Sequence, residues 1–292
     1  MYIKELFNKK PVISLEIFPP KPTTPITSIY NTLEGLKDLK PDFISVTYGA
    51  SGTSKSYTVE LADIIKNTYH IEALAHLTCY NSTKDEIDLI LNRLRDKNIQ
   101  NVLALRGDLP KDYIINVSTT NLNHANDLVH HINSYGGFSI GGACYPEGHV
   151  ECRSSLEDLK NLKEKVSHGV DFLITQLFFN NDFFYNFKEK LDILGISIPI
   201  SAGIMPVINK KQIERITSMC GATLTPKFKR IINKYEYNPE ALTEAGIAYA
   251  TEQIIDLLSF GVDGIHLYTM NRSDVAQKII NDISNIRSYY AM

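Results

Sequence analysis

The sequence has no tryptophan and only four cysteines among its 292 residues. No two of these cysteines form a Cys-x-x-Cys pair, which excludes a zinc ribbon and a thioredoxin-type redox motif. Free thiols in a reducing cytoplasm are the simplest interpretation. The chain also lacks an apolar run long enough to cross a membrane, and residues 1–10 lack the apolar segment of a signal peptide. We therefore expect a cytoplasmic protein that does not enter membranes.

A large excess of one charge is absent as well. Lysine and arginine number 30 against 33 aspartates and glutamates, so the net charge is -3. This balance gives no general attraction to nucleic acid or to an anionic membrane. Neither a G-x-G-x-x-G motif nor a Walker lysine loop is present, so a dinucleotide would not be bound in the Rossmann manner. His76 and His149 lack the neighbouring ligands of a metal cluster, and we expect no metal site.

What the sequence does contain is a regular alternation of short apolar runs and longer amphipathic stretches. The apolar runs predict eight strands, at 12–18, 43–47, 73–78, 101–105, 138–144, 172–175, 198–202 and 264–267. Helices are predicted between them, among others at 26–39, 58–68, 84–97 and 153–168. Strands and helices that alternate at this spacing are typical of parallel βαβ units.

Residues 1–292 contain no linker rich in Pro, Gly or Ser that would divide the chain. Eight uninterrupted βα units favour the α/β class and a single (β/α)8 TIM barrel, with an open doubly wound sheet as the alternative. The segment 209–260 between the last two strands is long enough for more than one helix. Pro226 and Pro239 are expected to separate its parts.

Residues 102–108 give the first indication of a site. An apolar strand ends there in Arg106, Gly107 and Asp108. Glycine allows the backbone to turn, and polar groups at a strand end are expected at the active-site face of a barrel. Arg106 suits a phosphate or a carbonyl oxygen, and Asp108 suits amide-like donors. The alternative is a salt bridge between Arg106 and Asp108.

The first strand places a carboxyl group near the same face. Ile13, Leu15 and Ile17 alternate with Ser14, Glu16 and Phe18. If the apolar set meets the helices, Glu16 points into the barrel near its carboxyl end. Burial beside Phe18 would raise the pKa of Glu16 and suit it to act as a general acid. Pairing of Glu16 with an inward-facing Lys or Arg is an equally open interpretation.

The other strands also end in polar side chains. Together they outline a polar rim at one end of the predicted barrel, formed by Thr47, Tyr48, His76, Tyr145, His149, Gln176, Tyr268 and Arg272. For each histidine taken separately, a structural role is the simpler interpretation.

The helix predicted at 153–168 has two distinct faces. Its buried stripe is expected to contain Leu156, Leu159, Leu162 and Val166. A second face carries Asp158, Asn161 and Lys165 at helical spacing. This face would suit a nucleotide whose phosphates meet Lys165, whereas an ordinary solvated surface is the simpler alternative.

Eight motifs in order along the chain resemble those of the methylenetetrahydrofolate reductase family. They are Ser14-Leu15-Glu16-Ile17-Phe18-Pro19-Pro20, Val46-Thr47-Tyr48-Gly49-Ala50, His76-Leu77-Thr78-Cys79, Leu105-Arg106-Gly107-Asp108, Tyr145-Pro146-Glu147-x-His149, Thr175-Gln176-Leu177-Phe178-Phe179, Gly203-Ile204-Met205-Pro206 and His266-Leu267-Tyr268-Thr269-Met270-Asn271-Arg272. One such motif would be weak evidence, but the ordered set is specific. The resemblance is to the short bacterial form, without a regulatory domain.

The resemblance implies a barrel that binds FAD and reduces 5,10-methylenetetrahydrofolate to 5-methyltetrahydrofolate. NADH or NADPH would donate the hydride in a ping-pong reaction through the flavin, and the product would supply methyl groups for methionine synthesis. A small-molecule folate substrate and a homo-oligomer are also implied. Glu16 matches the general acid, and Asp108 matches a catalytic carboxylate near both flavin and pterin.

The resemblance also assigns binding residues. Cofactor-binding positions correspond to Thr47, Tyr48, Ala50, His76, Arg106, Gly107, Asp108, Ala125, Tyr145, His149, Cys152, Asp158, Asn161 and Lys165. Substrate-binding positions correspond to Asp108, Gln176, Gln212, Tyr268 and Arg272. Ile216 stands where an aromatic residue is common in the family, which leaves the identity of the electron donor open.

Two other functions are compatible with the residues alone. One is a flavin-free barrel lyase or aldolase that uses Glu16 and Asp108 on a metal. The other is a barrel without activity that binds a flavin or a folate as a partner subunit. Flavin absorbance of the purified protein separates the first alternative from the reductase, and turnover of a Glu16→Gln variant separates the second.

Overall fold

The computed structural model describes residues 1–21, 23–48, 52–80, 82–108 and 122–290, with the side chains of 52–56 excepted. Eight parallel strands form a closed barrel in the order β1 to β8. Their bounds are β1 Val12–Ile17, β2 Phe43–Val46, β3 Glu72–Thr78, β4 Asn101–Leu105, β5 Ser139–Cys144, β6 Phe172–Thr175, β7 Ile200–Ile204 and β8 Gly264–Tyr268. Each strand pairs with its neighbours in the chain, and β1 pairs with β8. The closed ring confirms the (β/α)8 prediction and excludes the open sheet.

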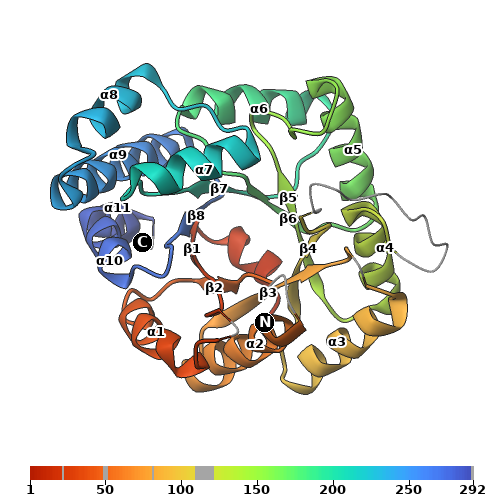
Figure 1. Cartoon of the computed structure of the whole chain (residues 1–292). Helices are drawn as coiled ribbons and strands as arrows, with labels where there is room; N and C mark the ends of the chain where they lie inside the picture. The colour runs from red at the N-terminus through yellow and green to blue at the C-terminus, as the bar shows by residue number, and fades with distance from the viewer. Residues whose placement is uncertain (22, 49–51, 81, 109–121, 291–292) are drawn as a thin grey trace.

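Helices surround the ring on its outer side (Figure 1). Their bounds are α1 Tyr30–Lys37, α2 Gly52–Asp63, α3 Lys84–Asp96, α4 Ala125–Tyr135, α5 Ser155–Ser167, α6 Asn181–Ile193, α7 Lys210–Cys220, α8 Pro226–Tyr235, α9 Pro239–Phe260, α10 Ser273–Asp282 and α11 Ser284–Tyr289. Pro226 and Pro239 occupy first-turn positions of α8 and α9, where a missing N–H costs nothing. The predicted division of segment 209–260 is therefore confirmed. None of the helices in the described ranges is long and apolar enough to cross a membrane.

Several predicted bounds were wrong by a few residues. β7 begins at Ile200 rather than at residue 198, because Pro199 has no N–H to donate to the sheet. The helix predicted at 26–39 starts with the 3-10 turn η2, Ile26–Ile29, and α1 ends at Lys37. The helix predicted at 58–68 begins earlier, as α2, and ends in one π-helical turn, η3 Ile64–Thr68.

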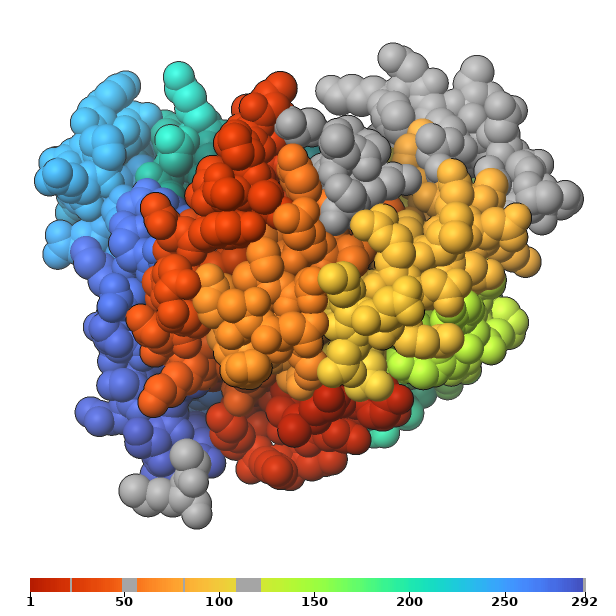
Figure 2. Space-filling view, turned by 90° about the horizontal axis from the view of Figure 1, so that it is seen from below, coloured from red at the N-terminus to blue at the C-terminus, as the bar shows by residue number. Residues whose placement is uncertain are grey.

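The amino end of the barrel is closed by the first residues of the chain. The 3-10 helix η1, Ile3–Asn8, lies across this end, and the first residues appear at the base of the molecule in Figure 2. Ile3 is fully buried, and its backbone N–H donates to Oδ1 of Asn101 at 2.7 Å. The Phe7 ring lies 5.6 Å from the Phe172 ring. This plug closes the amino end of the barrel, so the described residues leave the carboxyl end as the place for a ligand.

Gly246 lets the long helix α9 approach the barrel closely. A Cβ atom at this position would lie 1.9 Å from the backbone oxygen of Val207. Because backbone must move to relieve this overlap, we expect Gly246→Ala to lower the free energy of unfolding by about 3 kcal/mol, the upper end for overpacking. Urea denaturation measures the change. The exposed Ala248 on the same helix provides a control, since Ala248→Ser should have almost no effect. Equal stability of the two variants would show that helix α9 does not approach the backbone of Val207 this closely.

Candidate functional site at the carboxyl end of the barrel

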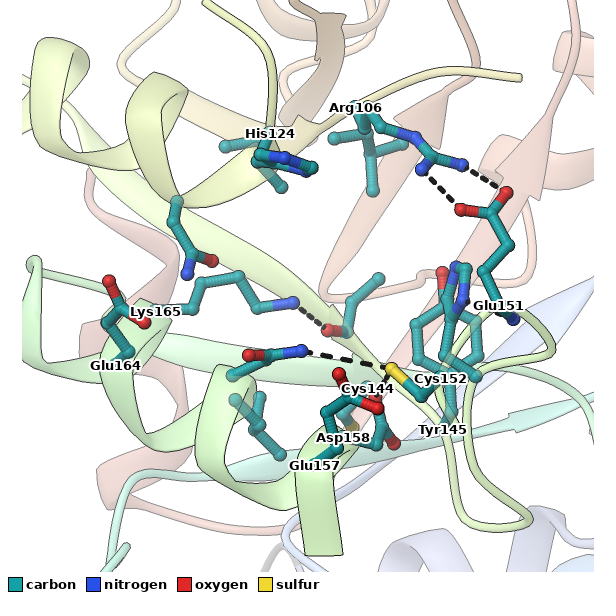
Figure 3. A pocket seen from close by; sticks show the side chains of 18 of the residues that line it. Arg106, His124, Cys144, Tyr145, Glu151, Cys152, Glu157, Asp158, Glu164 and Lys165 are labelled. Atoms are coloured by element: carbon teal, nitrogen blue, oxygen red, sulfur yellow. Dashed lines mark hydrogen bonds and ion pairs between the residues drawn. The ribbon is translucent and has the colours of Figure 1, made fainter. Parts of the chain in front are cut away.

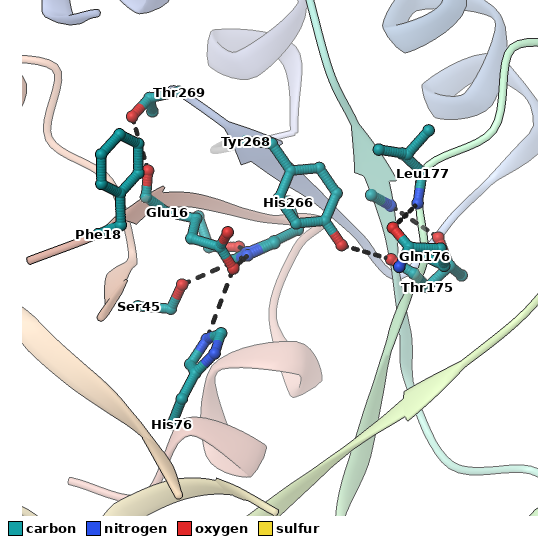
Figure 4. Close-up of polar contacts among 12 residues, drawn as sticks. Glu16, Phe18, Ser45, His76, Thr175, Gln176, Leu177, His266, Tyr268 and Thr269 are labelled. Carbon is teal, nitrogen blue, oxygen red and sulfur yellow. Dashed lines mark hydrogen bonds and ion pairs between the residues drawn. The ribbon is translucent and has the colours of Figure 1, made fainter. Parts of the chain in front are cut away.

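Glu16 lies at the end of β1 with its side chain inside the barrel (Figure 4). Its Oε2 atom lies 3.4 Å from Nε2 of His266 on β8 and 3.5 Å from Nε2 of His76 on β3. Since β1 and β3 are not adjacent strands, the second contact crosses the barrel interior. The predicted inward orientation of Glu16 is confirmed. The alternative with a Lys or Arg partner was wrong, because the neighbours of Glu16 are imidazoles.

The two histidines differ in their surroundings. His266 is completely buried, and its Nδ1 lies 2.7 Å from the Ser14 hydroxyl. The Ser45 hydroxyl lies 3.4 Å from Nε2 of the same ring. His76 is 6% exposed, and burial lowers its pKa to about 4, because an imidazolium loses hydration there. His76 is therefore neutral at pH 7.

No role was predicted from the sequence for Ser14, Ser45 or His266. The alternation along the strands could have indicated Ser14 and His266. In the β1–β8 register Ser14 pairs with His266, and Glu16 pairs with Tyr268. All four side chains therefore belong to one inward set. The alternation that oriented Glu16 also identifies these neighbours.

Tyr268 and Gln176 lie near each other at the ends of β8 and β6 (Figure 4). The Tyr268 hydroxyl donates to the backbone oxygen of Thr175 at 2.7 Å, and burial raises the pKa of Tyr268 well above its usual value. Gly203 makes room for this ring, since a Cβ atom there would lie 2.7 Å from it. Gln176 accepts from the Leu177 N–H through Oε1 at 2.9 Å. Tyr268 and Gln176 thus form a second wall of the mouth.

The end of β4 turns as predicted. Gly107 has φ 93°, and a Cβ atom there would lie 3.1 Å from Cβ of Thr78. The predicted alternative of an Arg106–Asp108 salt bridge was wrong. Arg106 instead forms two bonds of 2.6 and 2.7 Å with the carboxylate of Glu151, which follows β5. These bonds raise the pKa of Arg106 and lower that of Glu151, and Asp108 is left exposed.

A pocket of about 470 Å³ opens between the ends of β4 and β5 and the helices α4 and α5 (Figure 3). Eight of the predicted cofactor positions line it together, namely Arg106, Ala125, Tyr145, His149, Cys152, Asp158, Asn161 and Lys165. The Tyr145 and His149 rings meet edge to face at 4.6 Å and form an aromatic wall. Burial raises the pKa of Tyr145 to about 12.

Lys165 is the most distinctive residue of this pocket. Its Nζ donates to the backbone oxygen of Ala143 at 2.6 Å, and burial lowers the pKa of its ammonium group. Within the described ranges, no carboxylate lies within 4.0 Å of this nitrogen. The solvated alternative for this face of α5 was therefore wrong for Lys165 and Asp158. Burial raises the pKa of Asp158. The expected buried stripe was also wrong at Leu156, which is 58% exposed.

The pocket residues fit a flavin dinucleotide. A diphosphate needs positive charge and N–H donors, and Lys165 supplies an ammonium group that has no carboxylate partner among the described residues. Helix α4 begins at the pocket with Ala125, and first-turn N–H groups favour anions. The hydroxyl and amine groups of a nucleotide can donate to Asp158 and Asn161, which lie on the facing side of α5.

The remaining predicted residues are more scattered. Gln212 lies half-buried in the first turn of α7. Arg272 is exposed and forms bonds of 2.8 and 2.6 Å with Asp274. The backbone oxygen of Thr47 accepts from the Thr58 hydroxyl at 3.0 Å. Burial raises the pKa of Tyr48 to about 12. Ala50 lies outside the described residues.

Across the part of the chain that the structure describes, no group of three His, Cys, Asp or Glu side chains is arranged to hold a metal ion. The polar groups described above instead gather around Glu16 and around the pocket beside Lys165. Both regions lie at the open end of the ring, the end at which (β/α)8 enzymes bind their ligands.

The closed ring and the polar groups at its carboxyl end define a (β/α)8 barrel with an enzyme-like site. The chain belongs to the methylenetetrahydrofolate reductase family, whose model matches residues 2–284. The 5,10-methylenetetrahydrofolate reductase of Escherichia coli is 33% identical over 271 residues, which cover 93% of this chain and 90% of that protein. Methylenetetrahydrofolate reductase (NADH) 1 of Arabidopsis thaliana is 36% identical over 286 residues, with 94% of this chain and 48% of that protein covered.

The chain spans about half the length of the plant and fission-yeast relatives that it matches. Among solved structures, an uncharacterized protein from Clostridium thermocellum that binds two copies of 5-methyl-5,6,7,8-tetrahydrofolic acid has a TM-score of 0.70. It is 16% identical, and the match covers 99% of this chain and 98% of that protein. This similarity establishes the shared fold.

Proposed function

We propose that the protein reduces 5,10-methylenetetrahydrofolate to 5-methyltetrahydrofolate with bound FAD and with NADH or NADPH as the hydride donor. The observation that carries the proposal is Glu16, an acid held inside the barrel mouth between His266 and His76. Family membership and the names of the relatives support the same reaction. The folate ligand of the Clostridium barrel supports the substrate class. The product would supply methyl groups for methionine synthesis.

Glu16 would act as the general acid. The five-membered ring of the substrate must open before its methylene carbon can accept a hydride. Glu16 donates its proton to the nitrogen that leaves this carbon as their bond breaks, and the carbon remains double-bonded to the other ring nitrogen as an iminium cation. His266 holds the carboxyl group in place through Oε2, and Ser14 holds His266. His76 is neutral and adds no competing positive charge.

Asp108 would stabilise the iminium cation. Its carboxylate is exposed at the end of β4, next to the pocket-lining residue Arg106. A fixed negative charge near a developing cation lowers the barrier, because it favours the transition state more than the neutral substrate. Gln176 and Tyr268, on the opposite wall, would hold the pterin ring.

Lys165 and the first turn of α4 would hold the diphosphate of FAD, with Tyr145 and His149 as the aromatic wall. Bound FAD would supply the hydride-transfer chemistry between the nicotinamide and the folate, and the two substrates would use the site in turn. The chain's own contribution is to bind, to orient and to supply the proton of Glu16.

Purified protein tests the proposal directly. We expect a yellow protein, or a colourless one that becomes yellow after incubation with FAD. With NADH or NADPH it should convert methylenetetrahydrofolate to 5-methyltetrahydrofolate, identified by chromatography of the product. Protein that neither binds flavin nor forms this product would contradict the proposed function.

A change at Asp108 should affect one half-reaction more than the other. Asp108→Asn removes the negative charge at similar size, so we expect folate reduction to slow by about 10²-fold, as when one electrostatic stabiliser is removed. Flavin reduction by the nicotinamide should change much less. Rapid mixing resolves the two steps. The exposed Asp282 provides the control, since Asp282→Asn should change neither rate. An equal loss in both steps would assign Asp108 to flavin binding alone.

A further inference from the structure

The backbone pairing between β1 and β8 stops at the residue that carries the proposed acid. Glu16 and Tyr268 form the last pair of this register. β1 ends one residue later, at Ile17, and the next residue, Phe18, is followed by two prolines that have no N–H to donate. On the side of β8, backbone pairing therefore gives β1 no support beyond the position of Glu16 itself.

Two side chains that follow β8 continue the pairing where the backbones separate. The Asn271 side chain accepts from the Phe18 N–H at 3.0 Å through Oδ1 and donates to the Phe18 oxygen at 2.9 Å through Nδ2. The Thr269 hydroxyl donates to the backbone oxygen of Glu16 at 2.6 Å (Figure 4). We call Thr269 and Asn271 the β8 clamp. It holds the backbone of β1 at Glu16 and again two residues later.

The β8 clamp depends on a backbone conformation that residues other than glycine rarely adopt. Met270 and Asn271 have φ of 51° and 57°, which lie in the left-handed region. Asparagine tolerates this region, whereas methionine does not favour it. The Thr269 hydroxyl also accepts from the Asn271 N–H at 3.1 Å, and Met270 packs against the apolar cluster that contains Met205. Strained conformations persist where the surroundings fix them, and they are concentrated at functional sites.

The β8 clamp fixes the backbone from which the acid projects. His266 and His76 contact the carboxyl group of Glu16, and Thr269 holds the same residue at its backbone oxygen. Thr269 is 1% exposed, so water cannot replace this hydrogen bond if the hydroxyl is removed. A displacement of about 1 Å between reacting groups can slow a reaction by about 10²-fold. A small movement of the end of β1 would therefore matter for proton transfer.

We propose that Thr269 and Asn271 are positioning residues for proton transfer from Glu16. This inference rests on the proposed function. The β8 clamp holds the end of β1 so that the Glu16 carboxyl group meets the leaving nitrogen of the folate. Neither side chain has to contact the substrate for this role, and neither is needed when the nicotinamide reduces the flavin. The β8 clamp should therefore affect the folate half-reaction alone.

Thr269→Val tests the proposal, with Thr269→Ser as its matched partner. Valine keeps the shape of threonine without the hydroxyl, whereas serine keeps the hydroxyl. On the FAD-loaded protein we expect Thr269→Val to slow folate reduction by about 10²-fold and Thr269→Ser to stay within about threefold of the wild type. Flavin reduction by NADH or NADPH and the Kd for 5-methyltetrahydrofolate should change less than about twofold in both variants. Rapid mixing resolves the two rates, and titration calorimetry measures the Kd.

Asn271→Gly removes the other half of the β8 clamp at a half-buried position, where glycine keeps the left-handed backbone without strain. Folate reduction should slow by about tenfold, the equivalent of one hydrogen bond, and flavin reduction should change much less. The Phe18 amide loses its acceptor in this variant, so its hydrogen should exchange with deuterium about tenfold faster. Mass spectrometry of the fragment that contains Phe18 measures the exchange independently of turnover.

Asp42→Ala provides the control for a general loosening of β1, because Asp42 accepts from the Ile13 N–H at 2.8 Å at the other end of this strand. It should lower the melting temperature and leave the ratio of the two rates unchanged. An equal loss of both half-reactions in Thr269→Val, or faster exchange at Phe18 with unchanged folate reduction, would overturn the positioning role and leave the reductase assignment intact. A wild type whose flavin is reduced but does not reduce the folate would overturn the reductase assignment, and the positioning role with it.

Discussion

Glu16→Gln is expected to abolish folate reduction while sparing the oxidation of NADH or NADPH with an artificial electron acceptor. Glutamine keeps the size of the side chain and its reach toward His266 and His76, but its amide is too weak an acid to transfer a proton to the leaving nitrogen. A positioned general acid contributes about 10²–10⁴-fold, and we expect a loss near the upper end because ring opening depends on it. Only the folate half-reaction needs the acid.

The two activities are measured on the same FAD-loaded variant. Folate reduction is followed by product formation, and nicotinamide oxidation by its absorbance in the presence of an artificial acceptor. Glu5, an exposed glutamate of η1 at the opposite end of the barrel, provides the control, because Glu5→Gln should change neither activity. If both activities of the Glu16 variant fall together, Glu16 supports flavin binding and is not the acid.

Lys165→Met is expected to weaken FAD binding by about 10–100-fold, since a hydrogen bond from a charged donor contributes about 1.5–3 kcal/mol. Nζ of Lys165 has a carbonyl and no carboxylate as its neighbour among the described residues, so its charge remains available to a phosphate. Methionine keeps most of the apolar stem. The protein without flavin should remain folded, because burial already disfavours the ammonium group in that state.

Fluorescence titration of the flavin-free protein with FAD measures this change. Lys163 lies two residues earlier on α5 and is exposed, so Lys163→Met removes the same charge outside the pocket. It should leave the affinity within about twofold of the wild type, as is usual for surface changes. An Lys165 variant that binds FAD as tightly as the wild type would place the diphosphate elsewhere.

The repeated features of the fold could be predicted from local patterns in the sequence. The alternation of apolar runs and amphipathic stretches predicted the closed ring, because every βα unit repeats the same burial pattern. The inward direction of Glu16 and the turn at Gly107 also followed, since each depends on a few adjacent residues.

Pairing between distant residues did not follow from the sequence. Arg106 meets Glu151 across 45 positions, and Glu16 meets His266 across 250. Periodicity shows which way a side chain points but not which charge stands opposite. For the same reason the solvated alternative for Lys165 was favoured, although this side chain is half-buried and donates to the backbone of Ala143 on β5.

The sequence also gave no prediction of the plug that η1 forms at the amino end of the barrel. Residues 1–10 are too short and mixed in polarity for a pattern to appear, yet Ile3 and Phe7 complete the barrel floor. Leu156 was assigned to the buried stripe because it fits the helical period. It lies in the first turn of α5, where its side chain is largely exposed, and the helical period alone does not show where the cover of a helix begins.

The most direct test of the account is an anaerobic rapid-mixing experiment on the FAD-loaded wild type. NADH or NADPH is mixed first, and methylenetetrahydrofolate is added once the flavin absorbance has bleached. We predict that the absorbance returns at a rate fast enough to account for turnover and that 5-methyltetrahydrofolate forms in equal amount to the flavin reoxidised. Flavin that stays bleached after the folate is added would contradict the proposed reaction.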